Sequence, residues 1–230
     1  MPPADESRVQ FVMRQVADHI GREGLKVGDQ LPSETRFVEL LGVSRPVVRE
    51  AFGALAALNI IDVGNGRRPR VSAVNGSVLA SSLEHAVRTQ QISVQEVWET
   101  RRIIEIETIA LAAVRRSDEE AARIVALASA MAQSAPSSPE LMRLDLSLHK
   151  AIAQASRNGL MARIIASFEP LLEATIPVAW SKVQSDAHHA VMLERHRELA
   201  ETIRLRDPDA ARKAMDDHFD RAVGASLPTS

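Results

Sequence analysis

The chain has 230 residues and a formal net charge of −2, and 45% of its residues are hydrophobic but only 3% aromatic. That length is typical of two domains, and a core of Ala, Leu, Ile and Val with few aromatic rings favours packed helices over a sheet. The absence of Cys excludes disulfide bonds and thiolate metal sites, and the near-neutral charge excludes a purely electrostatic nucleic-acid binder.

The sequence also lacks the patterns of export and membrane insertion. The first ten residues, MPPADESRVQ, do not show a basic segment followed by an apolar one. The longest uncharged apolar stretch, residues 51–61, is far shorter than the roughly 20 residues that cross a bilayer. We therefore expect a cytoplasmic protein without membrane contact.

Residues 1–73 carry the patterns of three helices in succession. Apolar residues at helical spacing predict a first helix over residues 7–21. Ser33 is a suitable N-cap for a second helix, and Gly42 can supply the left-handed residue of a tight turn before Ser44, which caps a third. Two helices joined by such a short turn are typical of a helix-turn-helix.

A short β-hairpin is expected directly after the third helix. Residues 60–63 and 70–73 have strand character, and residues 64–66 read Gly-Asn-Gly, which signals the tip of a hairpin. The apolar stripes of the second and third helices place Leu40 and Leu58 on their buried faces. The N-terminal domain is therefore predicted as a winged helix-turn-helix of three helices plus a small β-hairpin, a module that places its third helix in the DNA major groove.

Arginine residues are concentrated where such a module meets DNA. Arg45 and Arg49 are four residues apart at the start of the third helix and share one face, from which Arg can bind a guanine edge through two hydrogen bonds. Arg67, Arg68 and Arg70 lie in the hairpin, where they suit contacts with the DNA backbone or minor groove. The alternative is that all of these are ordinary solvated Arg residues.

This block resembles the GntR superfamily of bacterial repressors, whose motifs run G-D-x-L-P-S-E-R and then G-V-S-R-x-x-V-R-E-A. The matching residues are Gly28, Asp29, Leu31, Pro32, Ser33, Glu34, Gly42, Val43, Ser44, Arg45, Val48, Arg49, Glu50 and Ala51. One departure is Thr35, which stands where the family usually has Arg, and the adjacent Arg36 is expected to take over that contact. We therefore expect DNA contacts from Arg36, Ser44, Arg45, Arg49, Arg67 and Arg68.

The rest of the chain has helical periodicity almost throughout, without a strand signal or an internal repeat. Residues 72–76 are small and polar, which indicates a linker, and residues 77–230 are predicted as an all-α helical bundle. The expected helices cover residues 77–90, 94–115, 118–133, 139–156, 159–174, 186–205 and 208–223, with a turn or short helix near residues 177–183.

Four polar side chains fall within the apolar stripes of three of these helices, namely Asp145, His149, His196 and His218. A buried unpaired polar group costs roughly 1–3 kcal/mol, and one shared divalent metal relieves that cost for all four. Three imidazoles and one carboxylate suit Zn²⁺ first, with Ni²⁺ or Mn²⁺ as alternatives. The competing interpretation is four independent core groups, each hydrogen-bonded to the backbone or to water.

The helix over residues 94–115 has a second anomaly, because Arg101 and Glu105 lie in its apolar stripe. An inward-facing Arg suits a carboxylate ligand, which its guanidinium can hold through a forked, charge-assisted hydrogen bond. The competing interpretation is an internal salt bridge between Arg101 and Glu105 at i,i+4 spacing. Asn158, which precedes Gly159, is by the same local reasoning a helix C-cap.

This second domain resembles the FCD domain of the FadR branch of the GntR superfamily. The matching residues are Glu99, Arg101, Ile104, Glu105, Leu111, Ala112, Ala113, Asp145, His149, Ser156, Asn158, His196 and His218. The resemblance implies a metal held by Asp145, His149, His196 and His218, and a small carboxylate effector held by the metal and Arg101. Glu105 and Asn158 are expected to line the same effector pocket. A homodimer on a short pseudo-palindromic operator is also implied, with the effector releasing the DNA.

These features together predict a metal-dependent, effector-responsive transcriptional regulator, more specifically a repressor, and not an enzyme. Two alternatives stay open at this point. One is a metal-dependent hydrolase or lyase fused to a DNA-binding domain, in which Glu105 acts as the base. The other is a regulator whose metal is purely structural and holds the bundle together. Sugar acids, hydroxy acids, fatty-acid derivatives and amino acids all remain candidate effectors, and the polar pocket favours a small polar acid.

Overall fold

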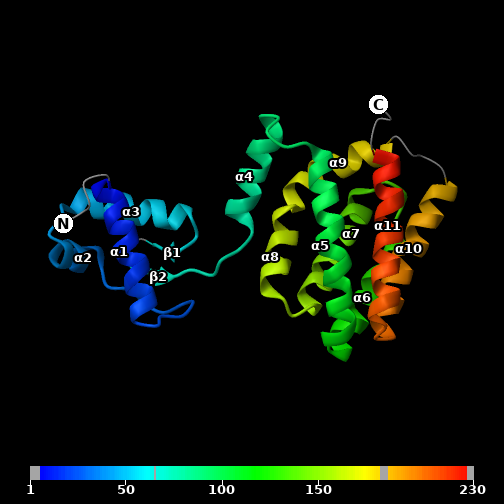
Figure 1. Cartoon of the computed structure of the whole chain (residues 1–230), viewed down its shortest axis with the longest axis horizontal. Helices are drawn as coiled ribbons and strands as arrows, with labels where there is room; N and C mark the ends of the chain where they lie inside the picture. Colours follow the sequence, from blue (N-terminus) through cyan, green and yellow to red (C-terminus); the bar gives the residue numbers. More distant parts are fainter. Residues whose placement is uncertain (1–5, 65, 182–185, 227–230) are drawn as a thin grey trace. The chain divides into compact units, whose positions relative to one another are not determined.

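The computed structural model describes residues 6–64, 66–181 and 186–226 (Figure 1). The chain folds as two compact units, Met1–Val78 and Leu79–Ser230. The division falls inside a helix, slightly later than the linker expected at residues 72–76. Both units are mainly helical, and strands occur, among the described residues, only in the N-terminal unit, so the predicted mostly α fold is confirmed.

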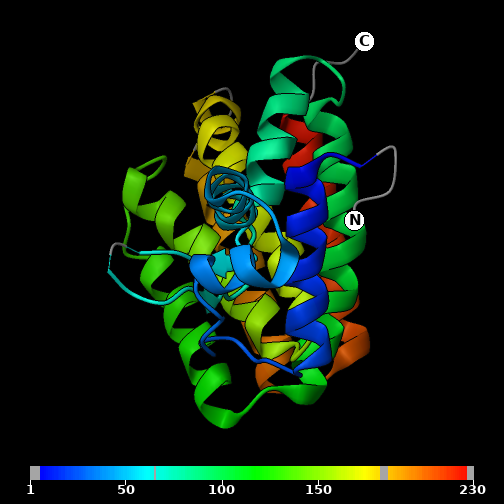
Figure 2. The ribbon, with the colours of Figure 1, turned by 90° about the vertical axis from the view of Figure 1, so that its left-hand side faces the viewer.

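The N-terminal unit contains the elements expected of a winged helix-turn-helix, in the expected order. Its elements are α1 (Arg8–Arg22), α2 (Glu34–Leu41), α3 (Arg45–Ala57), β1 (Ile61–Asp62) and β2 (Arg70–Val71). The three helices lie against one another around a single apolar core in which Phe37 and Phe52 meet edge to face (Figures 1 and 2). The core therefore fixes the position of α3 within this unit.

The turn between α2 and α3 follows the expected cap chemistry. The Ser33 hydroxyl accepts a hydrogen bond from the Arg36 backbone N–H and begins α2. Gly42 ends α2 with φ 62°, a left-handed conformation that favours glycine. Ser44 is the N-cap of α3 by its backbone angles, but its side chain makes no capping hydrogen bond. The hydroxyl of Ser44 is thus not used to begin the helix that it precedes.

Two residues expected on buried faces of these helices are exposed, so that prediction is wrong. Leu40 is 52% exposed, and Phe37 is the one buried residue of the short helix α2, so the buried face of this helix is narrower than the spacing indicates. Leu58 is 45% exposed, because α3 ends at Ala57 and the helical period does not extend to the cap residue. Helical spacing predicts burial only while the helix continues.

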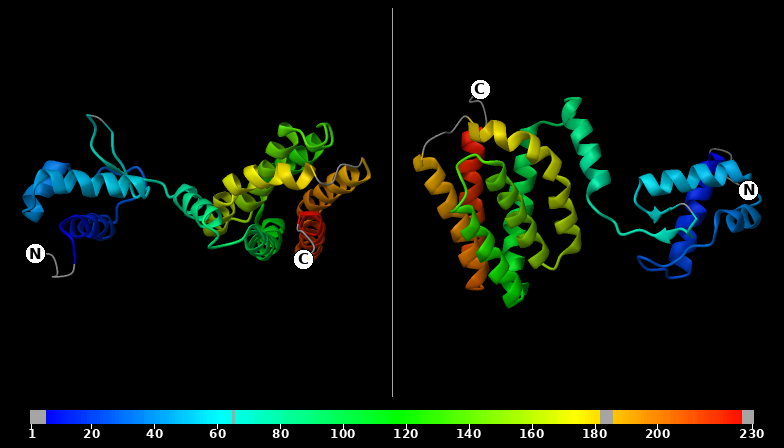
Figure 3. Two further views of the ribbon diagram at one scale, coloured as in Figure 1. Left: turned by 90° about the horizontal axis from the view of Figure 1, so that it is seen from above. Right: turned by 180° about the vertical axis from the view of Figure 1, so that it is seen from behind.

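The hairpin is shorter than expected. β1 pairs antiparallel with β2, with Ile61 opposite Val71 and Asp62 opposite Arg70. The loop that joins the strands projects away from the helices of its unit (Figure 3, left). Asn65, at the expected hairpin tip, lies outside the described residues.

The chain that leaves the hairpin is ordered by hydrogen bonds within the same unit. Asn59 has φ 54° just after α3, and its side-chain amide donates to Asn75 Oδ1 at 3.1 Å and to Ser77 Oγ at 2.7 Å. Asn75 lies in the expected linker and Ser77 begins α4. The linker is thus held to the C-terminal end of α3.

The second unit is the predicted all-α bundle. Its helices are α4 (Ser77–Arg88), α5 (Val94–Arg115), α6 (Asp118–Met131), α7 (Pro139–Ala155), α8 (Gly159–Ser167), α9 (Glu169–Ser181), α10 (Asp186–Arg204) and α11 (Pro208–Ser226). In Figure 1 and in the rear view of Figure 3, α5, α7, α10 and α11 stand side by side, and α9 lies across one end of the bundle. The four neighbouring helices supply all the polar residues that the sequence places in the core.

The helix expected over residues 159–174 is in fact two helices, α8 and α9. Pro170 explains the break, because proline lacks an N–H and its ring clashes with the carbonyl four residues earlier. The turn or short helix expected near residues 177–183 is, as far as Ser181, the end of α9, and the remaining residues lie outside the described ones.

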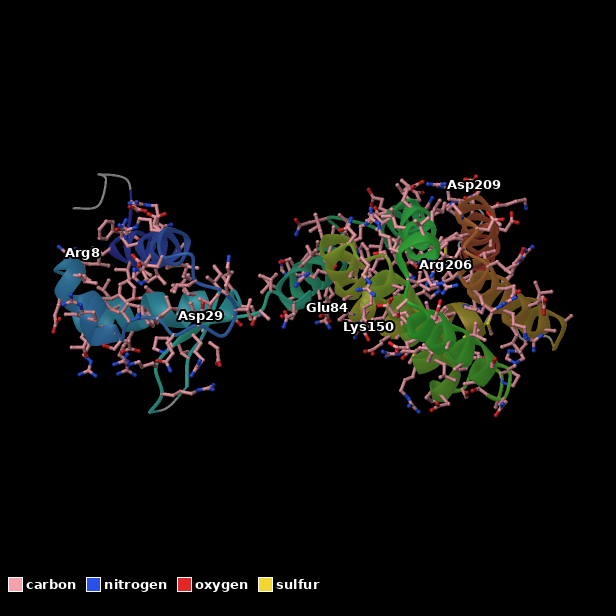
Figure 4. All side chains as sticks on the ribbon, turned by 90° about the horizontal axis from the view of Figure 1, so that it is seen from below. Arg8, Asp29, Glu84, Lys150, Arg206 and Asp209 are labelled. Carbon is pink, nitrogen blue, oxygen red and sulfur yellow. The ribbon has the colours of Figure 1, made fainter. Side chains whose placement is uncertain are left out.

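Arginine side chains fix one end of the bundle. The buried Arg116 follows α5 and donates through Nη2 to the carbonyl of Arg204, the last residue of α10, at 2.6 Å. Arg206, labelled in Figure 4, donates to the carbonyl of Val114 at 3.2 Å. Helix C-termini leave carbonyls without intrahelical partners, and these guanidinium groups satisfy them. The register of α5 against α10 is set in this way.

Candidate functional site

The N-terminal end of α3 presents the residues predicted to contact DNA. Ser44, Arg45 and Arg49 are exposed, while Val48 is fully buried in the core. The buried contact holds the helix in place and leaves the two guanidinium groups on its outer face. Free N–H groups at this helix end add a further attraction for phosphate.

The other arginines predicted to contact DNA are exposed, but two of them already form ion pairs within the domain. Arg36 pairs with Glu39 on α2 at 3.0 Å, and Arg67 pairs with Asp62 on β1 at 3.0 Å. Exposed pairs of this kind contribute about 0–1 kcal/mol, so a phosphate can replace the carboxylate at little cost. Arg68 is exposed, and it lines an open depression of about 640 Å³ together with Arg36.

Arg70 has a structural role in the hairpin. Its Nη1 donates to the carbonyl of Gly28 at 2.6 Å, and its backbone bridges to Gln30. These bonds tie β2 to the loop before α2. From the sequence, Arg70 is as suitable for DNA contact as Arg67 and Arg68. Spacing along a hairpin does not show which side chain turns back toward its own domain.

In the second unit the bundle gathers six polar side chains in its interior. Arg101 and Glu105 come from α5, Asp145 and His149 from α7, His196 from α10 and His218 from α11. All except His218, which is partly exposed, are buried, with exposures from 1% to 7%. The prediction that they face the core is thus confirmed, and they lie together rather than as independent groups.

The three imidazoles form a compact group. Ring centroids are 4.7 Å apart for His196 and His218, 5.2 Å for His149 and His218, and 5.9 Å for His149 and His196. One ring nitrogen from each lies within 4.8 Å of one nitrogen of each of the others. A single ion with ligands at about 2.1 Å has its ligands no more than about 4 Å apart, so a small closure of this group suffices.

Asp145 completes the group through His196. The Nδ1 of His196 is 2.8 Å from the carbonyl of Met192, and since a carbonyl only accepts, Nδ1 carries the proton. Nε2 is then the ring nitrogen that remains for a metal, and Asp145 Oδ1 lies 2.8 Å from it. This nitrogen is the only buried side-chain polar atom, among the described residues, that lacks a hydrogen-bond partner. A carboxylate oxygen and an imidazole nitrogen at this separation can serve as two ligands of one cation.

The surroundings of this group lower the pKa values of both Asp145 and His218. Burial raises the pKa of Asp145, but the neighbouring imidazoles, His196 first, lower it well below its usual range. Burial, reinforced by the charges of His196 and His149, lowers the pKa of His218 well below that of a free imidazole. Asp145 is therefore an anion and His218 is neutral near pH 7, which are the forms that bind metal.

Glu105 links this group to Arg101. Its Oε1 accepts from Arg101 Nε at 2.7 Å and lies 2.7 Å from Nη2, while Oε2 is 2.5 Å from His149 Nδ1. Burial raises the pKa of Glu105, but the charges and hydrogen bonds of Arg101 and His149 outweigh it and lower the pKa. Burial lowers the pKa of His149, but the Glu105 carboxylate raises it more. The salt bridge considered from the sequence is present, with a second partner that the sequence did not indicate.

Two aromatic residues also line this cluster and were not predicted as part of it. The Arg101 guanidinium lies 4.9 Å from the Trp98 ring and 5.5 Å from the Phe219 ring. Both distances are typical of cation–π contacts. Trp98 is three residues before Arg101 on the same face of α5, and Phe219 directly follows His218, so their positions in the sequence carried a usable signal.

Asn158 is the N-cap of α8 and not a C-cap, so that interpretation is wrong. Its Oδ1 accepts from the backbone N–H groups of Leu160 and Met161, each at 3.2 Å. The left-handed residue after α7 is Arg157, with φ 56°. A role for Asn158 in the effector pocket stays a prediction.

None of the helices within the described ranges is long and apolar enough to cross a membrane.

Comparisons with known proteins agree with both units. Residues 8–71 match the family of bacterial regulatory proteins called the gntR family, and residues 96–221 match the FCD domain. The chain is 28% identical over 222 residues to the HTH-type transcriptional repressor NanR of Salmonella newport (strain SL254), covering 95% of this chain and 85% of that protein. The NanR protein of Salmonella typhi is also 28% identical over 222 residues.

Among solved structures, a GntR protein of Streptococcus agalactiae resembles this fold with a TM-score of 0.68 at 23% identity, covering 94% of this chain and 99% of that one. The sequence matches span the exposed face of α3 and all six residues of the buried cluster. The chain therefore belongs to the GntR family of DNA-binding transcriptional regulators that carry a C-terminal FCD domain, and it is not an enzyme.

Proposed function

We propose that the protein is a transcriptional repressor whose affinity for its operator is controlled by a small carboxylate bound at a divalent metal site in the FCD domain. The observation that carries this proposal is the contact between Asp145 Oδ1 and the unpartnered Nε2 of His196 at 2.8 Å. The name of the NanR relatives, which are repressors, supports the direction of control. A regulator of this kind acts in the cytoplasm, where bacterial DNA lies.

Asp145, His149, His196 and His218 are the residues that would hold the metal. They offer one carboxylate and three imidazoles from three helices of one bundle, and all four lie where the bundle brings them close. Nitrogen and oxygen donors without thiolate suit Zn²⁺ first, with Ni²⁺ or Mn²⁺ as alternatives. When bound, the ion supplies a positive docking point for a carboxylate oxygen.

Arg101 is the residue that would recognise the effector. Its guanidinium is 2% exposed and lies between Glu105 and two aromatic rings, so it offers a preorganised, strongly charged donor to an anion. A buried guanidinium favours a carboxylate over a neutral ligand through charge-assisted hydrogen bonds. The polar character of the cluster favours a small polar acid. Asn158 and Glu105 stay predicted members of this pocket.

The N-terminal unit would read the operator. The exposed Arg45 and Arg49 would bind guanine edges in the major groove, and the exposed Arg36, Ser44, Arg67 and Arg68 would contact phosphates or the minor groove. A homodimer would present two such helices to two half-sites. A 100-fold change in operator affinity requires about 2.7 kcal/mol of preference for one arrangement, which is within the usual range of allosteric coupling.

Native mass spectrometry of the purified full-length protein, followed by operator binding with and without zinc and candidate acids, tests the proposal. We expect a dimer that retains about one metal ion per subunit and releases operator DNA when the acid is added. A protein that binds no divalent metal, or whose operator binding ignores every acid that occupies the metal site, contradicts it. Unfolding on chelation without any competition from acids would instead indicate a purely structural metal.

A further inference from the structure

The carboxylate of Glu105 is divided between two partners that have different proposed roles. Oε1 accepts a hydrogen bond from Arg101 Nε and forms an ion pair with Arg101 Nη2, and Oε2 accepts from His149 Nδ1. The side chains of all three residues are 3–4% exposed. A charged carboxylate at such a depth is stable only when its oxygens are paired, and here both are.

The bond to His149 determines which of its ring nitrogens can bind a metal. A carboxylate only accepts, so the contact at 2.5 Å places a proton on Nδ1. Nε2 is then the ring nitrogen available to a metal, because Nδ1 keeps its proton in the hydrogen bond to Glu105. Carboxylates that hold a metal-binding imidazole in this way fix its tautomer and its orientation and increase its basicity.

The bonds to Arg101 determine where its guanidinium points. The guanidinium is paired with Glu105. Its central carbon lies 4.9 Å from the centre of the Trp98 ring and 5.5 Å from the centre of the Phe219 ring. Arg101 and Glu105 are one turn apart on α5, whereas His149 is on α7. One side chain thus sets the orientation of two others on different helices.

We propose that Glu105 is a positioning residue that presents His149 to the metal and Arg101 to the carboxylate effector, and that it does not itself bind the effector. The inference rests on the proposed function, because it assigns a role within the same metal and effector site. The sequence suggests that Glu105 contacts the effector directly. This proposal instead gives Glu105 a role that it exerts through His149 and Arg101.

Glutamine at this position has nearly the same shape but cannot satisfy both partners while His149 keeps its proton on Nδ1. If its amide oxygen faces Arg101, its NH₂ group faces His149 Nδ1, which must then give up its proton and carry it on Nε2. If the amide is turned over, its NH₂ group faces the donors of Arg101. The first arrangement keeps a bond to His149 only in the reversed tautomer, which places a proton on the nitrogen that the metal needs, and the second loses the bonds from Arg101.

The test compares zinc affinity in the full-length parent protein, in Glu105→Gln and in Glu107→Gln, measured by competition with a chromophoric chelator. Glu107 lies on the same helix, but its carboxylate pairs with Arg212 at 3.1 Å on the surface, so it is a matched control. We expect Glu105→Gln to bind zinc about 10- to 100-fold more weakly than the parent. Glu107→Gln should match the parent.

A second measurement needs no variant and reports the tautomer directly. Long-range ¹H–¹⁵N spectra of the zinc-loaded parent should show His149 protonated at Nδ1 and metal-bound through Nε2. If His149 is instead protonated at Nε2 and metal-bound through Nδ1, the inference is overturned. This measurement decides the question even if Glu105→Gln fails to fold. Equal zinc affinity of Glu105→Gln and the parent overturns it while the proposed function stands. A parent protein that binds no zinc, nickel or manganese overturns both together.

Discussion

Asp145 Oδ1 lies 2.8 Å from His196 Nε2, although His196 already donates from Nδ1 to the Met192 carbonyl and Nε2 has no hydrogen bond. Two acceptors held this close, on α7 and α10, repel each other unless a cation or a proton stands between them. The imidazoles, His196 first, lower the pKa of Asp145 against the opposing effect of burial, which keeps the carboxylate anionic near neutral pH. The pair therefore offers an anionic oxygen and an imidazole nitrogen to one shared cation, and a divalent ion can take that place.

The first prediction concerns this pair. We expect zinc to raise the melting temperature of the parent protein, because an ion that binds only the folded state stabilises it by about 2.7 kcal/mol at 100 times its dissociation constant. Asp145→Asn keeps the shape but removes the anionic ligand, so most of that rise should be lost. Differential scanning calorimetry with zinc and with excess chelator measures both effects. Asp209→Asn, a change to an exposed side chain, is the control. An undiminished zinc effect in Asp145→Asn counts against the site.

The second prediction separates effector binding from DNA binding. Acids that shift the melting temperature of the zinc-loaded parent should lose that shift in Arg101→Met, because the charge-assisted bond to the carboxylate is removed. The variant should still bind the operator, since α3 belongs to the other unit.

Arg102→Met is the matched control for Arg101→Met. Arg102 is the next residue on α5 but pairs with Asp216 through Nε at 2.8 Å, away from the buried cluster. It should keep the response to the acid even if it lowers the melting temperature. If DNA release by the acid persists in Arg101→Met, Arg101 does not read the effector.

Much of this site was predictable because long helices keep their period. Asp145 and His149 are one turn apart on a helix of 17 residues, so their place on its buried face follows from spacing alone. That the three imidazoles and Asp145 come together depends on how α7, α10 and α11 pack. The family resemblance supplied that step, since no local pattern does.

The errors came from places where a local pattern has two structural meanings. Asn before Gly is compatible with a helix end and with a helix start, and here Arg157 takes the left-handed position, which leaves Asn158 extended to cap α8. An Arg and a Glu one turn apart predict a salt bridge, but not that the second carboxylate oxygen reaches His149 across the interface with α7. Contacts between helices decide these cases.

The third prediction concerns pH and stability at the start of α6. The carboxylate of Glu120 accepts from the Ser117 backbone N–H at 2.7 Å and from Arg157 at 3.0 Å. The hydrogen bond to Ser117, with a smaller contribution from Arg157, lowers the pKa of Glu120 against the opposing effect of burial. A lowered pKa in the folded state means that the stabilisation is complete above the unfolded pKa of about 4.3 and is lost as pH falls through the folded pKa.

Glu120→Gln should therefore destabilise the protein by about 0.3–1 kcal/mol at pH 7, and the difference from the parent should disappear toward pH 3. Chemical denaturation of both proteins in the presence of chelator, from pH 7 to pH 3, measures the difference without a contribution from metal. The exposed neighbour Glu119, changed to Gln, is the control. A constant difference between Glu120→Gln and the parent over the whole range would show that charge is not responsible.

The last prediction concerns the recognition helix. Arg49 is exposed one turn into α3, and Val48 beside it is fully buried, so Arg49→Ala should remove a DNA contact without disturbing the fold. A bidentate Arg–guanine contact is worth about 1–3 kcal/mol, which corresponds to a loss of roughly 5- to 150-fold in operator affinity for each half-site. Fluorescence anisotropy with labelled operator DNA at one fixed salt concentration measures this loss.

Arg143→Ala controls for the loss of one positive charge, since Arg143 is an exposed residue on α7 that pairs with Glu140. It should leave operator affinity nearly unchanged, and both variants should keep the zinc affinity of the parent. The loss in Arg49→Ala should also be larger on the operator than on unrelated DNA, because a base contact discriminates between sequences and a phosphate contact does not. An equal loss on both DNAs would mean that Arg49 holds the backbone, and that the bases are read by another part of the winged helix.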